Sequence, residues 1–175
     1  MIKNILFISA FCLLITNLTV QTCVAKEAGI NIARITLRAD TLPPTDVMDV
    51  ISAVVYSTNN FNIETVANLY TPNAVVADDE PPYSWNGPTA GIQWVNAIEQ
   101  ECKNIQLTKL RGTIGAINIY QQRDGNIYIV VPVNYTGLLP GKVRFTANGA
   151  FTFVLRMTNG KWLIKSQAWM PQKGM

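Results

Sequence analysis

The chain has 175 residues, of which 49% are apolar, and it carries 14 basic and 11 acidic side chains but no histidine. This length allows one domain of ordinary size with an appendage. Without histidine the sequence cannot build a Ser-His-Asp or Cys-His nucleophile or an imidazole metal site, so acid–base chemistry near neutral pH falls to a carboxylate, a tyrosine or a lysine whose pKa is shifted.

The N-terminus has the layout of a secretory signal peptide. Lys3 supplies a positive charge, an apolar run covers residues 5–15, and a small-residue site ends at Ala25. This pattern predicts cleavage after Ala25 and export, either to a periplasm or out of the cell. The alternative is an uncleaved membrane anchor, because residues 5–20 approach the minimum length of a bilayer span. We expect residues 1–25 to be removed and the mature protein to have no membrane association.

The mature chain is expected to be nearly neutral and free of disulfides. It would keep 13 basic and 11 acidic side chains, since only Lys3 is removed. No basic cluster indicates a nucleic acid as partner. Cys102 would be the one remaining cysteine, and we interpret it as a small buried hydrophobe rather than a reactive thiol.

Residues 26–44 are expected to form an irregular arm, and residues 45–172 a domain that begins with helices. A first helix is predicted from Thr45, directly after two prolines, with an apolar stripe at helical spacing. A short second helix is predicted from Asn62, a residue that favours the N-cap. The further elements are a strand at 74–77 that runs into an acidic triplet at 78–80, and a third helix from 87–88 that directs Trp94 and Cys102 to the core.

The C-terminal half is predicted to be β-rich. The expected segments lie near 105–121, 126–136, 142–157 and 161–170, and Asn159-Gly160 between the last two is a strong hairpin signal. In the third segment the odd-numbered residues are mostly apolar and the even-numbered ones mostly polar. Helices followed by an antiparallel meander predict an α+β fold, in which a wide apolar sheet face must be buried.

Three stretches resemble the signature of the nuclear transport factor 2-like superfamily: Asn62–Asp78, Gly87 and the hairpin Asn159–Ile164. The resemblance is strongest to the branch of ketosteroid isomerases and polyketide cyclase-like (SnoaL-like) proteins, and it covers residues 45–170. It implies a cone-shaped, cystatin-like α+β fold. A strongly bent antiparallel sheet would wrap around the N-terminal helices and leave an apolar pocket at its open end.

The same resemblance implies the site residues. Asp78 stands where the isomerases carry the aspartate that acts as general base, and Trp94 and Trp169 match pocket-lining aromatic positions. Val54 and Thr152 stand where those enzymes place a tyrosine and a protonated aspartate as oxyanion donors. Only Thr152 could donate there, so efficient steroid isomerisation is not expected.

Each of these assignments has a structural alternative. Asp78 with its two acidic neighbours would also fit a solvated turn; three adjacent acids cannot converge on one ion, so no metal and no cofactor is expected. The tryptophans would also fit the core. Lys165 shares strand parity with Trp169, which makes it a further ligand-binding candidate, although a surface lysine is the simpler interpretation.

Two functions fit this pattern. The first is an exported isomerase or cyclase that acts on a small hydrophobic carbonyl compound with Asp78 as base. The second is a non-catalytic module that binds a hydrophobic ligand or a protein partner in the same pocket. The register implied by the family turns Thr152 and its even-numbered neighbours into the cavity. The odd-numbered face, with Phe151 and Phe153, would then lie outside, where a second subunit would cover it, so a homodimer is expected.

Overall fold

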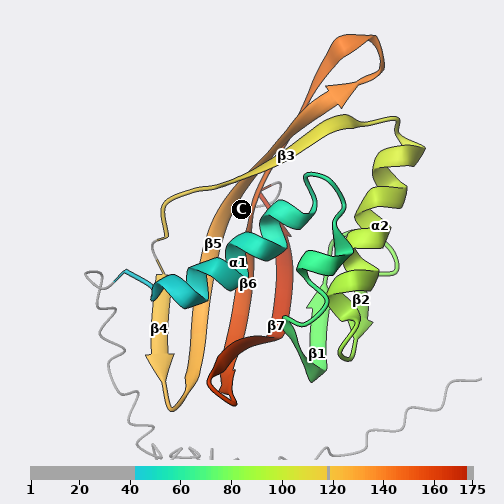
Figure 1. Ribbon diagram of the computed structural model, residues 1–175. Helices are drawn as coiled ribbons and strands as arrows, with labels where there is room; N and C mark the ends of the chain where they lie inside the picture. The colour runs from blue at the N-terminus through green and yellow to red at the C-terminus, as the bar shows by residue number, and fades with distance from the viewer. Residues whose placement is uncertain (1–41, 118, 173–175) are drawn as a thin grey trace, which may run out of the picture. The chain divides into compact units, whose positions relative to one another are not determined.

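The computed structural model describes residues 42–117 and 119–172, and every structural statement below concerns these residues (Figure 1). The predicted signal peptide at 1–25 and nearly all of the predicted arm at 26–44 lie outside the described residues. Within these two ranges, no helix combines the length and the apolar character that crossing a bilayer requires.

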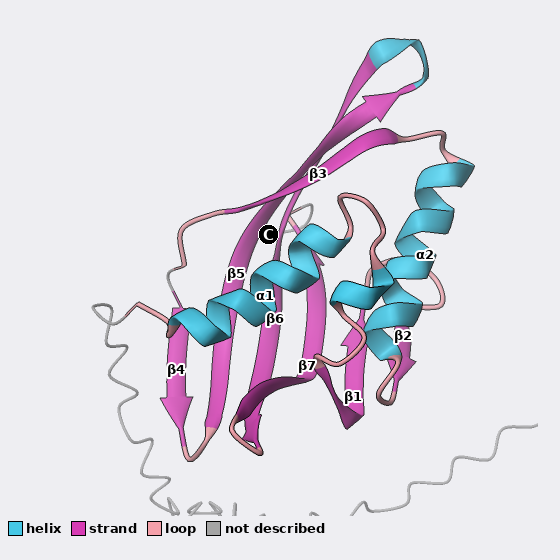
Figure 2. Cartoon of the chain, in the orientation of Figure 1, coloured by secondary structure: helices cyan, strands magenta, loops and turns pink. Residues whose placement is uncertain are grey.

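The described part of the chain consists of two α-helices packed on one curled sheet; both helices precede the third strand, and the first two strands lie between them in the chain (Figure 2). The helical elements are α1 (Thr45–Ser57), the 3-10 turn η1 (Ile63–Thr65), α2 (Ala90–Asn104) and the 3-10 turn η2 (Pro140–Lys142). The strands are β1 (Tyr70–Ala77), β2 (Ser84–Asn86), β3 (Thr108–Ile114), β4 (Ile119–Arg123), β5 (Asn126–Leu139), β6 (Val143–Thr158) and β7 (Lys161–Pro171). This order confirms the predicted α+β class.

The seven strands form one open sheet in the order β2-β1-β7-β6-β5-β3, with β4 pairing the remaining length of β5. The β1–β7 pair is parallel and the other pairs are antiparallel. The long β5–β6 hairpin forms the middle of the sheet, and α1 crosses the face that the sheet curls around (Figure 1). α2 lies beside β1 and β2. The sheet and α2 thus face each other across the space that holds the site.

Apolar spacing explains the two α-helices. Val47, Ile51 and Val54 recur at i, i+4 and i+7 and are fully buried, so α1 begins at Thr45 as predicted. α2 begins at Ala90, later than predicted. The preceding strand β2 still pairs with β1, and Gly87 follows it with φ of 92°, a left-handed conformation that an α-helix cannot contain.

The predicted helix at Asn62 is a single 3-10 turn. Its N-cap forms as expected, because the Asn62 side chain accepts a hydrogen bond from Glu64 N at 3.0 Å. The chain then turns into the sheet. Ile164 N donates to Leu69 O at 2.7 Å, and Tyr70 is already paired with β7. Pairing with the sheet therefore prevails over local helix propensity in this segment.

The predicted register of β6 is wrong. Phe151 and Phe153 are 1% and 0% exposed and belong to the core cluster with the residues of α1 and α2, whereas Thr152 is only half-buried on the opposite face. The strand turns its apolar side toward the helices because a one-residue shift would expose both phenylalanines. The chain's own helices therefore cover the face that a second subunit was expected to cover, and the homodimer stays a prediction.

A β-bulge explains why strand parity misled the interpretation of Lys165. β6 and β7 pair Leu155 with Ile164 and Val154 with Ser166, so Lys165 is an extra residue between two ladder positions. Ile164 before the bulge and Gln167 after it are both buried, whereas Lys165 is exposed. The bulge reverses which parity faces inward, and Lys165 does not share a face with Trp169.

Candidate functional site

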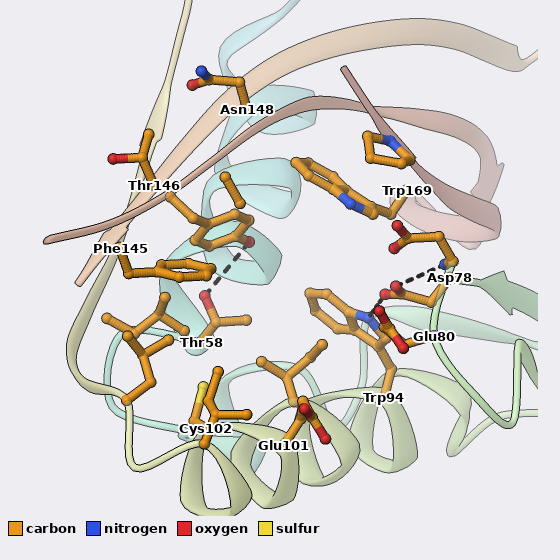
Figure 3. Close-up of a pocket in the computed structure, with 18 of the residues that line it drawn as sticks. Thr58, Asp78, Glu80, Trp94, Glu101, Cys102, Phe145, Thr146, Asn148 and Trp169 are labelled. Atoms are coloured by element: carbon orange, nitrogen blue, oxygen red, sulfur yellow. Dashed lines mark hydrogen bonds between the residues drawn. The ribbon is translucent and has the colours of Figure 1, made fainter. Parts of the chain in front are cut away.

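A cavity of about 580 Å³ opens between α2, the loop after β1 and the inner faces of β5, β6 and β7 (Figure 3). Thr58, just after α1, lies on one side, and Asp78, just after β1, lies on the other. This size falls in the range of small-molecule sites in proteins. Its apolar lining comes mainly from Trp94, Ile98, Leu107, Leu110, Phe151 and Trp169.

Four aromatic rings from four different elements pack against one another at the cavity. Phe151 of β6 meets Trp94 of α2 edge to face at 5.6 Å between ring centroids, and it lies 4.8 Å from Trp169 of β7. Trp169 in turn lies 5.7 Å from Tyr135 of β5. Such pairs are favourable arrangements of aromatic quadrupoles, so the wall is fixed in shape before a ligand arrives.

Asp78 is held at the cavity by donors to both carboxylate oxygens. The indole Nε1–H of Trp94 donates to Oδ2 at 2.6 Å, and the backbone N–H of Asp79 donates to Oδ1 at 2.9 Å. The backbone N–H of Asp78 itself donates to Tyr83 O at 3.0 Å, which closes the loop between β1 and β2. Asp78 is half-buried, whereas Asp79 and Glu80 are exposed. The triplet is thus not a uniformly solvated turn.

Burial raises the pKa of Asp78 to about 6. Loss of solvent is the largest cause, because it disfavours the charged form, while the hydrogen bond from Trp94 opposes it. The neighbouring charge of Asp79 raises the pKa further. A carboxylate with this pKa is ionised at neutral pH and is a stronger base than an ordinary aspartate.

Tyr135 is a pocket residue that the sequence analysis missed. It is 9% exposed, and its hydroxyl lies 3.5 Å from Thr58 Oγ1. Thr58 Oγ1 also lies 2.8 Å from the Val55 carbonyl oxygen, and because a hydroxyl has one proton, that proton is committed to this shorter bond. The Tyr135 proton therefore has only a long contact with Thr58 and stays available to a ligand. The signal in the sequence was its odd-numbered position on a strand whose odd-numbered residues are apolar.

Burial raises the pKa of Tyr135 well above its usual range, and the charge of Asp78 adds to this shift. The phenol is therefore protonated at every physiological pH. A neutral phenol at one side of the cavity and a carboxylate at the other are the two groups that a proton transfer beside a carbonyl needs.

Three of the five residues predicted for the site line the cavity: Asp78, Trp94 and Trp169. Thr152 does not, because it lies on the other face of β6, and Lys165 does not, because the bulge leaves it exposed. The expected pocket positions of Thr152 and Lys165 are therefore wrong. Val54 is fully buried in the core, so neither position matched to the oxyanion donors contributes one here.

The donors around the cavity do not form a recognisable metal centre. Across residues 42–117 and 119–172, no group of three or more His, Cys, Asp or Glu side chains is placed to hold an ion. Cys102 lines the cavity and is buried, and burial is the largest cause that raises the pKa of its thiol. It is thus an unreactive lining group.

No protein-family model and no curated protein sequence matches the chain. Solved structures do match its fold. Hexachlorocyclohexane dehydrochlorinase LinA-type3 from Novosphingobium barchaimii LL02 has a TM-score of 0.61 and 12% identity, over 75% of this chain and 90% of that one. A putative scytalone dehydratase from Novosphingobium aromaticivorans DSM 12444 has a TM-score of 0.60 and 12% identity, over 73% of this chain and 83% of that one.

A third match is a protein of unknown function with a cystatin-like fold from Nostoc punctiforme PCC 73102. Its TM-score is 0.55 at 10% identity, over 75% of this chain and 92% of that one. Together these similarities confirm the expected nuclear transport factor 2-like, cystatin-like fold. At such identities they show the fold alone, so the function has to be argued from the cavity.

Proposed function

We propose that this protein is an isomerase- or cyclase-type enzyme that moves a proton on a small hydrophobic carbonyl compound. The observation that carries the proposal is the Asp78 carboxylate, with its pKa raised to about 6, held by Trp94 at the edge of an aromatic cavity. A base of this kind is suited to removing a proton from carbon next to a carbonyl group. Two matching structures are named as a dehydrochlorinase and a putative dehydratase, which shows that the fold accommodates elimination chemistry.

Tyr135 would supply the second half of the chemistry. In a carbonyl compound with a β,γ double bond, Asp78 takes a proton from the α-carbon, and the electron pair moves through the C–C–O unit onto the carbonyl oxygen to give a dienolate. The Tyr135 hydroxyl donates a hydrogen bond to that oxygen, and protonated Asp78 then returns its proton to the γ-carbon, so that the double bond moves into conjugation with the carbonyl. Asp78 and Tyr135 both line this cavity of about 580 Å³, which has the volume for a small substrate. The aromatic rings exclude water and orient the ring system of the substrate.

A non-catalytic binding module is the second candidate. It is favoured by the fact that both oxygens of Asp78 already accept hydrogen bonds, at 2.6 and 2.9 Å, which lowers the basicity of the carboxylate. In that case the same aromatic rings would bind a ligand, and the protein would release it without chemical change. The two candidates make different predictions for the exchange of protons, although they share the ligand class.

Proton exchange into D₂O tests the proposal without knowledge of the natural product. Cyclic aryl ketones such as α-tetralone are incubated with the protein, and loss of the α-proton signal is followed by NMR. We expect wild-type exchange above the buffer rate and a fall of about 10²- to 10⁴-fold in Asp78→Asn, with ketone affinity nearly unchanged. Asp49→Asn is the matched control, because it removes an exposed carboxylate of α1 that does not line the cavity.

The binding module would be the correct description if ketones bind but wild type and Asp78→Asn exchange protons at the same rate. Native mass spectrometry of the purified protein adds the identity of a co-purifying ligand. A hydrophobic carbonyl compound there would support the enzyme, and its absence from a protein that also shows no exchange would contradict it.

A further inference from the structure

The charges around the cavity have one sign. Asp78, Asp79, Glu80 and Glu101 line it, and no lysine or arginine of residues 42–117 and 119–172 does. Figure 3 shows Glu80 beside Asp78 and Trp94, and Glu101 on α2 next to Cys102, so the acids occupy two sides of the opening. The chain as a whole has a formal net charge of +3. The negative lining is therefore a property of this site and does not follow from composition.

None of these four carboxylates has a counter-ion in the described part of the chain. The ion pairs there join Lys103 to Glu99 at 2.7 Å and Arg123 to Asp124 at 3.2 Å, and none of these four ion-paired residues lines the cavity. Asp79, Glu80 and Glu101 are exposed at the opening, and half-buried Asp78 accepts hydrogen bonds from neutral donors only, so no basic side chain neutralises this negative charge. The opening of the cavity would therefore attract a positively charged group.

Neighbouring negative charges raise the pKa values of three titratable groups in the cavity. After burial, which is the largest cause for each, the charge of Glu101 raises the pKa of Cys102, and the charge of Asp78 raises that of Tyr135. The charge of Asp79 likewise raises the pKa of Asp78. An anion entering the cavity would meet repulsion from several directions.

Acidic residues alone would not make a site, but two further features point to a ligand. The first is the cavity itself, whose aromatic walls include Trp94 and Trp169; the electron-rich faces of such rings attract organic cations. The second is the Tyr135 hydroxyl, buried at the cavity with a proton that only a 3.5 Å contact engages. The aromatic walls, the Tyr135 donor and the acids without basic partners together describe one kind of ligand.

We propose that the cavity takes an aromatic or polycyclic compound that carries a protonated amine, and that it rejects carboxylates and phosphate esters. The amine would lie at the opening against Glu101 and Glu80, while the ring system fills the aromatic part of the cavity. This inference rests on the proposed function, because it assigns a substrate class to the same site. The reacting carbonyl would then lie at the inner end of the ligand, between Asp78 and Tyr135.

Three probes with the same ring system separate charge from shape: naphthylmethylamine, naphthylmethanol and naphthoate. Their affinities are measured by calorimetry at pH 7.5 and at two salt concentrations. We expect the amine to bind at least tenfold more tightly than the alcohol, and the naphthoate at least tenfold more weakly than the alcohol. The preference for the amine should fall as salt is added, because screening acts on charge and leaves apolar contacts unaffected.

Glu101→Gln tests the assignment at the opening. It should weaken amine binding about three- to tenfold and leave the alcohol unchanged, with thermal melting as a check on folding. Glu64→Gln is the matched control, since Glu64 is an exposed glutamate on η1 that does not line the cavity. Equal losses of amine affinity in the two variants would contradict the assignment.

The outcomes also separate this inference from the proposed function. If the alcohol or the naphthoate binds as tightly as the amine, the cation preference is wrong, while ketone exchange that depends on Asp78 still supports the enzyme. If none of the three probes binds, the cation preference is wrong as well. If the amine is preferred but no exchange is found, the site binds cations without catalysis and the enzyme proposal fails alone.

Discussion

Trp94 and Asp78 are joined by a 2.6 Å hydrogen bond from the indole Nε1–H to the carboxylate Oδ2, and this bond connects α2 to the end of β1. Two effects act on the pKa of the Asp78 carboxyl in opposite directions. Burial beside the cavity raises it, and the donated hydrogen bond lowers it. The indole thus orients the carboxylate while it limits how basic the group becomes.

Trp94→Phe should raise the pKa of Asp78 above about 6. The substitution keeps an aromatic ring against Phe151 but removes the N–H that stabilises the ionised carboxylate. A hydrogen bond to a charged group is worth about 1.5–3 kcal/mol, which corresponds to a rise of about one to two pKa units. The carboxyl resonance of Asp78, followed by carbon-13 NMR against pH, measures the midpoint. Trp85→Phe, at a buried tryptophan that does not line the cavity, should leave the midpoint unchanged.

Asp78→Asn should stabilise the protein at neutral pH but not at pH 3. Below the unfolded pKa of 3.8, the carboxyl is neutral in both states and costs nothing. Between pH 3.8 and about 6 the unfolded chain loses its proton first, so the folded wild type becomes less stable as pH rises. Above pH 6 the penalty is constant, at about 1–3 kcal/mol once partial exposure is allowed for.

Urea unfolding of Asp78→Asn and wild type at pH 3, 5 and 7.5 follows this difference. Trp94 contacts the carboxyl, and Asp79, Glu80, Glu101 and Tyr135 line the same cavity, so Asp49→Asn, at an exposed carboxylate outside the cavity, serves as the reference. A difference between Asp78→Asn and wild type that is the same at all three pH values would show that Asp78 has an ordinary pKa.

Tyr135→Phe should reduce ketone exchange by about 10²- to 10³-fold, the usual cost of removing one oxyanion donor. Stability should change little, because the hydroxyl gives up only a 3.5 Å contact with Thr58. Tyr120→Phe is the control, since it removes the hydroxyl of a β4 tyrosine that bonds Gln122 at 2.6 Å and does not line the cavity. If Tyr135→Phe exchanges as fast as wild type, the phenol is not the donor.

Periodicity predicted the fold more reliably than the site. The spacing of Val47, Ile51 and Val54 was enough for α1, because burial repeats with the helical turn. The inward face of β6 was assigned from family spacing, and a single-residue error in a strand exchanges its two faces, so Thr152 was placed in the cavity. The bulge at Lys165 has no signature in the sequence.

The difference between Asp78 and its acidic neighbours could not be read from the triplet itself. Three consecutive acids are alike in sequence, and the indole of Trp94, 16 residues away, distinguishes one of them. Tyr135 was missed for the opposite reason: the apolar face of β5 made it look like an ordinary core residue. In both cases the chemistry depends on a contact between elements that local pattern does not contain.

Gly149→Ala should displace the Trp169 ring, which lines the cavity. Gly149 lies on β6, and a Cβ there would clash with the Met170 carbonyl oxygen and with the Trp169 ring. The backbone oxygen cannot give way without disturbing the β6–β7 ladder, and the ring can give way only by changing its packing against Phe151 and Tyr135. We expect a loss of stability of about 1–3 kcal/mol.

Gly149→Ala should also shift tryptophan fluorescence and bind naphthylmethanol at least tenfold more weakly, which calorimetry measures. Thr152→Ala on the same strand is the control, because its side chain lies on the opposite face and its removal should leave probe affinity unchanged. If Thr152→Ala lowers affinity and Gly149→Ala does not, ligand binds on the outer face of the sheet. In that case the inner aromatic cavity is not the site.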